Sequence, residues 1–381
     1  MTGQSGTMLE LAGLHDLVAL LRADGYTVVG PTVRDDAVVL AELTSAEELP
    51  AGWGVSAEPG RYRLVPRADG AVFAHSAGPQ SWKQYLHPPR RRLFSVRRDA
   101  PWTDDSGDSG AGDPPPRYAF LGVRPCDLIA IGVLDGVLGR GSTADPDFTA
   151  RRDGVFVVVA NCTEPGGLCF CVSMGGGPRA EAGYDLALTE RVDGAGHRFL
   201  AEAGTPAGER VLAALGGRAA TADDVATAGA DLTAAAGRMG RRMPEVDLRE
   251  LLAESRESPR WDDVASRCLA CGNCTMVCPT CFCTTTEDVT DVTGDHAERW
   301  QRWDTCFSLD FSYLHGGEVR TGVDARYRQW ISHKLSTWHD QFGTSGCVGC
   351  GRCIAWCPVG IDITAEATAL AEAREESGSG G

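Results

Sequence analysis

The sequence predicts an α+β protein in which an α/β N-terminal half is followed by a mostly helical, cysteine-rich domain. Two apolar stretches, 118–123 and 155–160, have the composition of buried strands, and a helical pattern over 128–138 lies between them. The fifteen cysteines are clustered, and none precedes Cys126. The segment PVGIDITAEATALAEAREE, which follows Cys357, is rich in strong helix formers.

The chain of 381 residues is long enough for two or three domains, each with its own core. We expect an α/β domain over 1–240 with a flexible Asp-, Ser-, Gly- and Pro-rich loop at 103–117, a cysteine-rich domain over 241–370 and a disordered tail over 371–381. A formal net charge of −16 argues against a nucleic-acid partner, since phosphate binding needs a cationic face. Because the N-terminus lacks a basic n-region and no apolar run approaches membrane-spanning length, we expect a cytoplasmic protein without membrane insertion.

The remaining N-terminal elements follow from short periodic patterns. Residues 9–21 place leucines and a valine on one helical face, and Gly25 ends this helix. Strands are expected in TVVG and AVVLAEL, on either side of a turn at residues 34–36. Residues 201–240 indicate helix plus linker, and a further helix over 246–255 leads into the cysteine-rich domain.

One strongly basic stretch, SWKQYLHPPRRRLFSVRR over 81–98, stands out in this acidic chain. It could dock an acidic partner subunit, or it could form a solvated face. We favour the solvated face, because charge runs most often belong to exposed surfaces.

Two cysteine runs near the C-terminus share the form C-x2-C-x2-C-x3-C-P, namely CLACGNCTMVCP over 268–279 and CVGCGRCIAWCP over 347–358. Three thiolates spaced by two residues on a turning loop can reach three irons of one cubane, while the fourth cysteine ligates the other cluster in two-cluster ferredoxins. We therefore predict a two-cluster ferredoxin-like domain with two 4Fe-4S clusters. The predicted ligands are Cys268, Cys271, Cys274 and Cys357 for one cluster, and Cys347, Cys350, Cys353 and Cys278 for the other.

Zinc is the alternative interpretation of these runs, since paired C-x2-C elements also form tetrahedral four-thiolate sites. Zinc knuckles rarely repeat a four-cysteine run with a trailing proline, so the spacing favours iron-sulfur clusters. A disulfide framework fits less well, because clustered cysteines in a reducing compartment indicate metal ligands.

A third metal site, iron-sulfur or zinc, is predicted from Cys126, Cys162, Cys169 and Cys171. Cys126 follows one buried strand at a helix N-terminus, where the helix dipole favours a thiolate, and Cys162 lies at the end of the next strand. If the two strands are parallel neighbours, both thiols emerge at the same sheet edge. Each cysteine alone could be an ordinary buried residue, but that interpretation suits four cysteines at strand ends poorly.

The segment between the two runs is longer than a compact βαβ ferredoxin requires, and it is rich in aromatic residues that we expect to shield the clusters from water. Three further cysteines in it are one ligand short of a set, which His333 could complete. They are Cys281, Cys283 and Cys306. Four cations of this segment could offset cluster charge or form a solvated helix face. They are Arg320, Arg326, Arg328 and Lys334.

Taken together, these motifs resemble those of a known family. They are FLGVRPCDL at 120–128, NC at 161–162, CFC at 169–171, CxxCxxCxxxCPTCFC at 268–283, RWDTC at 302–306, HK at 333–334 and CVGCGRCIAWCPVGIDI at 347–363. From about residue 118 to 365 the chain is similar to the iron-sulfur beta subunit of cytoplasmic nickel-iron sulfhydrogenases and to the related iron-sulfur subunit of anaerobic sulfite reductase.

The resemblance implies an electron-transfer subunit whose partner subunits carry the chemistry. One partner would hold a flavin and use NAD(P)H, and the catalytic subunits would hold nickel-iron or a sirohaem. The motifs do not separate the hydrogenase context from the sulfite reductase context, because the active site that distinguishes them lies on other chains.

The leading function is therefore an electron relay between a catalytic metal subunit of a hydrogenase complex and a flavin-containing, NAD(P)H-linked subunit. The sequence has no P-loop, no G-x-G-x-x-G fingerprint opening a helix and no histidine-rich metal site, so no catalytic residue is assigned. Two alternatives stay open. One is an enzyme whose α/β half binds a flavin or substrate beside the clusters, and the other is a redox-sensing or structural iron-sulfur protein.

Overall fold

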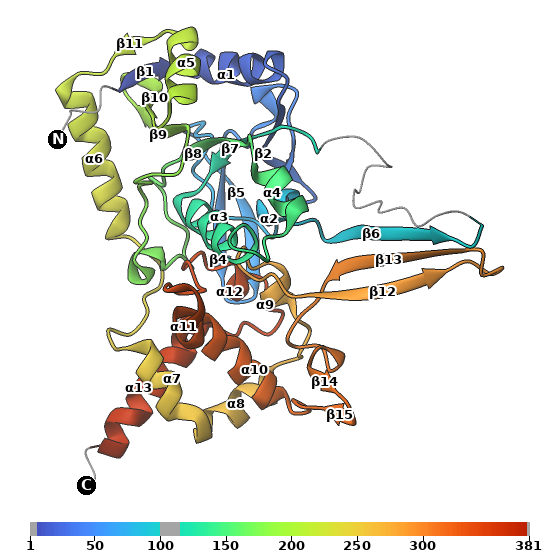
Figure 1. Cartoon of the computed structure of the whole chain (residues 1–381). Helices are drawn as coiled ribbons and strands as arrows, with labels where there is room; N and C mark the ends of the chain where they lie inside the picture. Colours follow the sequence, from blue (N-terminus) through green and yellow to red (C-terminus); the bar gives the residue numbers. More distant parts are fainter. Residues whose placement is uncertain (1–5, 100–114, 379–381) are drawn as a thin grey trace.

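The structure, a computed structural model, describes residues 6–99 and 115–378, so most of the loop expected at 103–117 lies outside the described residues. Its largest element is a mixed eight-stranded sheet, and a mostly helical region follows in the C-terminal third of the chain (Figure 1). The α+β class predicted from the sequence is confirmed. In spatial order the strands are β11 (Arg218–Ala219), β1 (Thr7–Glu10), β10 (Gly196–Ala203), β9 (Leu186–Asp193), β8 (Phe156–Ala160), β7 (Tyr118–Val123), β2 (Thr27–Arg34) and β3 (Ala37–Glu42).

The centre of this sheet is parallel and its flanks are antiparallel. Strands β2, β7, β8 and β9 pair in parallel, whereas β3 on one side and β10, β1 and β11 on the other pair antiparallel. All six residues of β7 and all five of β8 are buried, because helices cover both faces. The helices of this half are α1 (Leu11–Ala23), α2 (Lys83–Leu86), α3 (Pro125–Leu138), α4 (Pro146–Arg152), α5 (Pro206–Leu215) and α6 (Ala222–Ala236).

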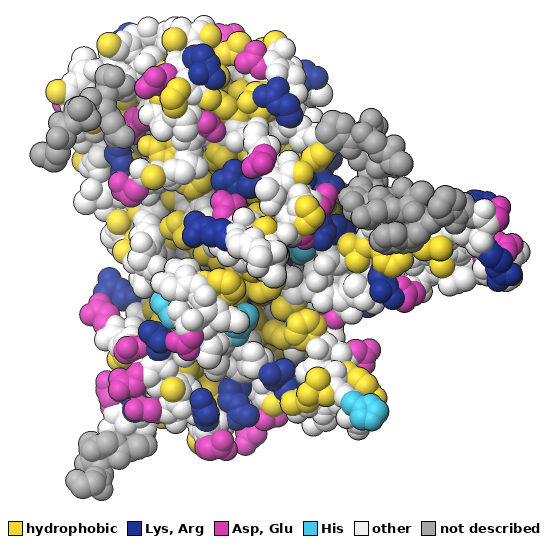
Figure 2. All heavy atoms as spheres, viewed as in Figure 1, with side chains coloured by type: hydrophobic (Ala, Val, Ile, Leu, Met, Phe, Trp, Pro, Cys, Tyr) yellow, Lys and Arg dark blue, Asp and Glu magenta, His cyan; other side chains and the backbone are white. Residues whose placement is uncertain are grey.

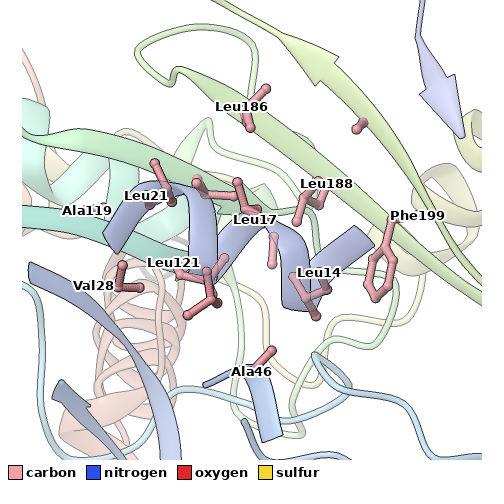
Figure 3. Close-up of a cluster of buried hydrophobic side chains, with 14 of the residues drawn as sticks. Leu14, Leu17, Leu21, Val28, Ala46, Ala119, Leu121, Leu186, Leu188 and Phe199 are labelled. Atoms are coloured by element: carbon pink, nitrogen blue, oxygen red, sulfur yellow. The ribbon is translucent and has the colours of Figure 1, made fainter. Parts of the chain in front are cut away.

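Alternate residues of β7 supply two separate cores, as the period of a strand requires. Ala119 and Leu121 face α1 and α5 in the core of Figure 3, where Leu17 of α1 lies among side chains of β7, β9 and β10. Phe120 faces the opposite side, where α3 and α4 pack on the sheet with Leu134 and Phe148. The apolar face of the helix predicted over 9–21 is therefore the face with which α1 packs on the sheet.

Several element boundaries differ from the sequence-based expectation. The first helix begins at Leu11, and Leu9 instead pairs with Phe199 as part of strand β1, because Glu10 has an extended backbone. Helix α3 begins at Pro125 rather than at 128, since proline is favoured in the first helical turn. The hairpin of β9 and β10 was not expected at all.

The C-terminal region is built from short helices around a third core that includes Trp261, Phe307, Tyr327 and Trp330. Its helices are α7 (Leu248–Glu254), α8 (Arg260–Arg267), α9 (Asn273–Met276), α10 (Val323–Ser332), α11 (Trp338–Phe342), α12 (Arg352–Ala355) and α13 (Ile363–Gly378), with a π-helical turn over His333–Thr337. Residues 371–378, expected in a disordered tail, are helical because Leu370 and Ala371 of α13 pack into this core. Residues 379–381 lie outside the described residues. No helix in the described part of the chain is long and apolar enough to cross a membrane.

A three-stranded arm projects from the body and joins distant parts of the chain (Figure 1). It consists of β12 (Thr284–Thr290), β13 (His296–Trp303) and β6 (Arg90–Arg97), in that order. The basic stretch expected to be a solvated face forms α2 and β6, and three arginines of β6 pair with carboxylates of the protein. Arg90 lies 2.9 Å from Glu287, Arg91 lies 2.5 Å from Asp145, and Arg92 lies 2.9 Å from Glu298. Figure 2 accordingly shows both signs of charge on the arm.

Three of the contacts between the α/β half and the cysteine-rich region involve the second cysteine run. Asp127 and Arg352, each 3% exposed, form a bidentate ion pair at 2.7 and 2.9 Å. The hairpin of β4 (Trp53–Glu58) and β5 (Arg61–Pro66) donates from the backbone N–H of Gly60 to the carbonyl of Ile354 at 3.0 Å. Phe170 N–H donates to the Gly349 carbonyl at 2.9 Å. The division of the chain at residue 240 stays a prediction.

The fold predicts a stability cost for emptying the first core. Leu17 is fully buried, so Leu17→Ala should lower the free energy of unfolding by about 2–5 kcal/mol through lost burial and the cavity left behind. The matched control is Leu11→Ala on the same helix, where the side chain is 37% exposed and the change should stay within about 0.5 kcal/mol. Urea denaturation of both variants measures the difference, and equal effects would contradict the assigned core.

Candidate metal centres

The two cysteine runs adopt the same backbone conformation. Ala270 and Gly349, at equivalent places before the second cysteine of each run, have left-handed φ values of 49° and 69°. Gly272 and Gly351 follow with φ of 74° and 75°, and each is succeeded by a four-residue helix, α9 or α12. A left-handed residue on both sides of the second cysteine turns the loop so that the first three thiols of each run face a common centre.

The first cysteine group, which consists of Cys268, Cys271, Cys274 and Cys357, surrounds one cavity. Cys357 comes from the second run, and it lines this cavity together with the first three cysteines of the first run. Phe307, Tyr327 and Trp330 close the cavity with aromatic rings, in agreement with the expected shielding. Cys271 is exposed, and this group therefore reaches the protein surface.

The second cysteine group consists of Cys347, Cys350, Cys353 and Cys278. Burial raises the pKa of Cys347 to about 12, and the neighbouring thiols of Cys350 and Cys278 raise it as well. Burial likewise raises the pKa of Cys353, and Cys347, Cys350 and Cys278 add to it. Cys278, the last cysteine of the first run, thus lies with the second run. Cys353 also lines the cavity of the first group, so the two groups are adjacent.

The surroundings of Cys278 favour the thiolate form of its side chain. A hydrogen bond from Cys281 lowers its pKa well below the usual thiol value, and Lys334 and Thr280 beside it lower the pKa further. The Thr280 hydroxyl lies 3.2 Å from the Cys278 sulfur. Because the thiolate is the form that binds metal, Cys278 is preorganised as a ligand.

The donor chemistry of both groups suits 4Fe-4S clusters. Each offers four soft thiol ligands in a partly buried setting, and backbone N–H groups point at sulfur, from Ala270 to Cys268 at 3.4 Å and from Ile361 to Cys357 at 3.3 Å. Such hydrogen bonds stabilise electron density on cluster ligands. Among the described residues, no three His, Cys, Asp or Glu side chains are arranged to hold a single metal ion.

The upstream cysteine group consists of Cys126, Cys162, Cys169 and Cys171. Strands β7 and β8 are parallel neighbours, which is the condition on which this predicted site depends. Cys126 occupies the first turn of α3, and Cys162 follows β8 by two residues. Burial raises the pKa of Cys169 to about 11 and that of Cys171 to about 12, and in both cases the Cys162 thiol is a contributing neighbour. All four thiols therefore lie in one region.

A buried guanidinium faces this upstream group. Arg124 is 5% exposed, and its side chain donates to the Cys162 sulfur at 3.2 Å and to the carbonyls of Phe73 and His75. Burial opposes its charge, but the thiols of Cys162, Cys126 and Cys169 outweigh burial and raise the pKa of Arg124. A buried cation is costly without an anion nearby, so Arg124 favours thiolates in this group.

The upstream and second groups are packed backbone to backbone. A Cβ on Gly349 would lie 2.5 Å from backbone atoms of Cys171, and one on Gly351 would lie 2.4 Å from the carbonyl oxygen of Leu168. Only glycine permits this approach at either position. The equivalent of Gly349 in the first run is Ala270, whose surroundings accommodate a Cβ.

The three remaining cysteines have no fourth ligand among the described residues, and Cys306 lies beside Cys274 of the first group as well as beside Cys283. Burial, with Cys283 as a neighbouring thiol, raises the pKa of Cys306 to about 12, and Cys281 hydrogen-bonds to Cys278. His333 does not complete a set, because its ring packs 4.7 Å from Trp338 and Nε2 lies 3.4 Å from Gln341 Oε1.

The four cations considered in the sequence divide between buried and partly exposed. Lys334 and Arg326 are buried, whereas Arg320 and Arg328 are partly exposed. Lys83, which the sequence analysis treated as part of the basic surface stretch, is also buried, with burial lowering its pKa to about 8. Burial opposes the charge of Lys334 as well, but Cys278 and Cys281 raise its pKa. No local pattern distinguishes these two lysines from surface lysines.

The sequence matches the 4Fe-4S dicluster domain over residues 267–361, the segment that contains both cysteine runs. The chain is also similar to the beta subunit of sulfhydrogenase 2 from Pyrococcus furiosus, with 30% identity over 290 residues that cover 74% of this chain and 79% of the relative. No solved structure matches the chain. This relationship, which extends far beyond the two runs, shows that the chain belongs to the family of iron-sulfur beta subunits of sulfhydrogenases.

Proposed function

We propose that this iron-sulfur subunit of a hydrogenase relays electrons between a catalytic nickel-iron subunit and a flavin-containing, NAD(P)H-linked subunit. The observation that supports a relay most directly is the exchange of Cys357 and Cys278 between the two runs, which sets the first and second cysteine groups side by side. A 4Fe-4S cluster bound at each group supplies reversible one-electron transfer. The chain positions the ligands, excludes water with aromatic side chains and stabilises charge on sulfur.

Each proposed cluster takes its four ligands from one of the two cysteine groups. Cys268, Cys271, Cys274 and Cys357 would hold one cluster, and Cys347, Cys350, Cys353 and Cys278 would hold the other. The exposure of Cys271 makes the first group one terminus of the relay, since a partner redox centre can approach it from the surface.

The upstream group would hold a third cluster at the opposite terminus. The buried Arg124 beside Cys162 and the close packing of Cys171 on Gly349 support this assignment. The order of the centres would then be the upstream group, the second group and the first group, because the second group adjoins both of the others.

The hydrogenase context is favoured over the sulfite reductase context by the relative from Pyrococcus furiosus, which is a sulfhydrogenase beta subunit. We place the protein in the cytoplasm, where clustered thiols stay reduced and available for iron. The flavin-binding enzyme and the redox sensor are not favoured by any residue of the three cysteine groups.

The crossover predicts which cluster depends on Cys357. Cys357→Ser should remove or convert the cluster of Cys268, Cys271 and Cys274, and should leave the one bound by Cys347, Cys350 and Cys353. Electron paramagnetic resonance of the anaerobically purified chain distinguishes the two. Cys283→Ser serves as the control and should keep both clusters, whereas loss confined to the second group in Cys357→Ser would contradict the crossover.

The third site predicts a specific iron content. Cys162→Ser should lower the iron bound per chain by about four atoms, the content of one 4Fe-4S cluster, while the signals of the other two clusters persist. Arg124→Gln should weaken retention of the same cluster, and Arg124→Lys should preserve more of it because the positive charge remains. Unchanged iron in Cys162→Ser, with both ferredoxin-type clusters intact, would refute the site.

The relay also predicts that the isolated chain lacks turnover. It should accept electrons from a strong chemical reductant, with bleaching of its visible absorption, but should not oxidise NAD(P)H, because the proposed clusters transfer electrons and do not bind that substrate. Sustained NAD(P)H oxidation by the purified chain alone would overturn this and would favour the enzyme alternative.

A further inference from the structure

Two lysines are buried beside the second cysteine group without a carboxylate partner. Lys83 and Lys334 are each 3% exposed, and neither forms an ion pair with a carboxylate within residues 6–99 and 115–378. The strongest charge influences on both are the sulfurs of Cys278 and Cys281. Because desolvating an ammonium group is expensive, two such groups in one place indicate that the second group carries substantial negative charge.

The Lys334 side chain contacts two segments of the chain that each carry a ligand of the second group. Its Nζ donates to the Thr280 hydroxyl at 2.6 Å and to the Gly346 carbonyl at 3.2 Å. Thr280 is the residue whose hydroxyl lies 3.2 Å from the Cys278 sulfur, and Gly346 immediately precedes Cys347. The Thr280 hydroxyl donates to the same Gly346 carbonyl at 2.6 Å, so it holds the ammonium group within one side chain of a ligand sulfur.

The local helix geometry supports a dedicated role for Lys334. Residues His333–Thr337 form a π-helical turn, a rare conformation that replaces the regular helix between α10 and α11. Such turns occur frequently at functional sites, because they redirect one side chain at a cost in backbone hydrogen bonding. Here the redirected region includes the buried lysine.

Lys83 supports the same site from the opposite half of the chain. Its Nζ donates to the Cys281 carbonyl at 2.8 Å and lies 3.8 Å from the centre of the Trp303 ring. Lys83 thus contacts the backbone near Cys278, whereas Lys334 contacts the Thr280 hydroxyl beside the ligand sulfur. The effect of Lys83 on the reduction potential should accordingly be smaller than that of Lys334.

The first group has a different electrostatic setting. Its buried cation Arg326 donates to the Phe307 carbonyl at 2.6 Å, and the nearby buried Glu366 is paired with Arg260 and Arg267. Arg326 donates only to backbone carbonyls, so the first group has one buried cation without a carboxylate partner within residues 6–99 and 115–378. The second group has two such cations, Lys83 and Lys334.

We propose that Lys334, assisted by Lys83, raises the reduction potential of the cluster at the second group and so makes it the preferred resting place for an electron in the relay. The proposal rests on the ligand set given under the proposed function. A cubane with four thiolates carries a charge of about −2 when oxidised, and one electron taken from a reductant makes it more negative. A fixed ammonium group stabilises the reduced form more than the oxidised form, in proportion to that added charge.

The test is a reductive titration of the full chain, purified anaerobically and followed by electron paramagnetic resonance. Lys334→Met should lower the midpoint potential of the second-group cluster and leave that of the first group unchanged. Lys334→Arg keeps the charge and should restore most of the midpoint. Thr280→Val keeps the ammonium group but removes the hydroxyl that lies beside the Cys278 sulfur. It should lower the midpoint potential of the second-group cluster by a smaller amount.

The signal of the second group is identified in the Cys357→Ser variant, where the first-group signal is expected to be missing. An unchanged second-group midpoint in Lys334→Met, with the cluster intact, overturns the proposal. If Lys334→Met loses the cluster, the midpoint potential of the second-group cluster is measured in Thr280→Val and in Lys83→Met. Unchanged midpoint potentials in both variants overturn the proposal. A wild-type chain without a second-group signal would instead contradict the ligand set.

Discussion

The buried ion pair between Asp127 and Arg352 connects the sheet to the cysteine loops, and the arrangement of the candidate centres depends on it. Asp127 follows Cys126 directly, and Arg352 lies between Cys350 and Cys353, so the pair fixes the upstream group relative to the second group. Arg352 also donates to the carbonyl of Gly78 at 3.1 Å, which adds a third segment to the same junction. Removing one partner of such a pair typically costs about 3–5 kcal/mol, because the other charge stays buried and unpaired.

Around this junction, the amino acids of the two runs differ where their surroundings differ. Both runs need a left-handed residue before the second cysteine, and alanine serves in the first run at Ala270. The second run uses Gly349, because the backbone of Cys171 leaves no room for a Cβ. The repeated loop is thus one structure, adapted at Gly349 and at Arg352 to neighbours that only the second run has.

The parts of the structure that can be predicted from the sequence are those marked by a pattern of neighbouring residues. The cysteine spacing is a local pattern, and the strands over Tyr118–Val123 and Phe156–Ala160 are continuous apolar runs whose ends coincide with the predicted ones within a residue. The hairpin of β9 and β10 lacks such a run. The burial of Lys334 could not be predicted, because its partners Thr280 and Gly346 belong to other segments of the chain and no nearby residue marks it.

The arm has a consequence for how the protein is made. Strand β6 pairs with β13, and Arg90 meets Glu287 across 197 residues of sequence, so β6 leaves the ribosome long before its partner exists. During that interval it is an unpaired strand edge, the kind of surface that recruits other chains into aggregates. Its five arginines, Arg90, Arg91, Arg92 and Arg97 in the strand and Arg98 just after it, repel a second copy of the same edge. Arg91 can pair with Asp145 once that residue has been made, whereas Arg90 and Arg92 keep their charge unpaired until Glu287 and Glu298 of the arm follow.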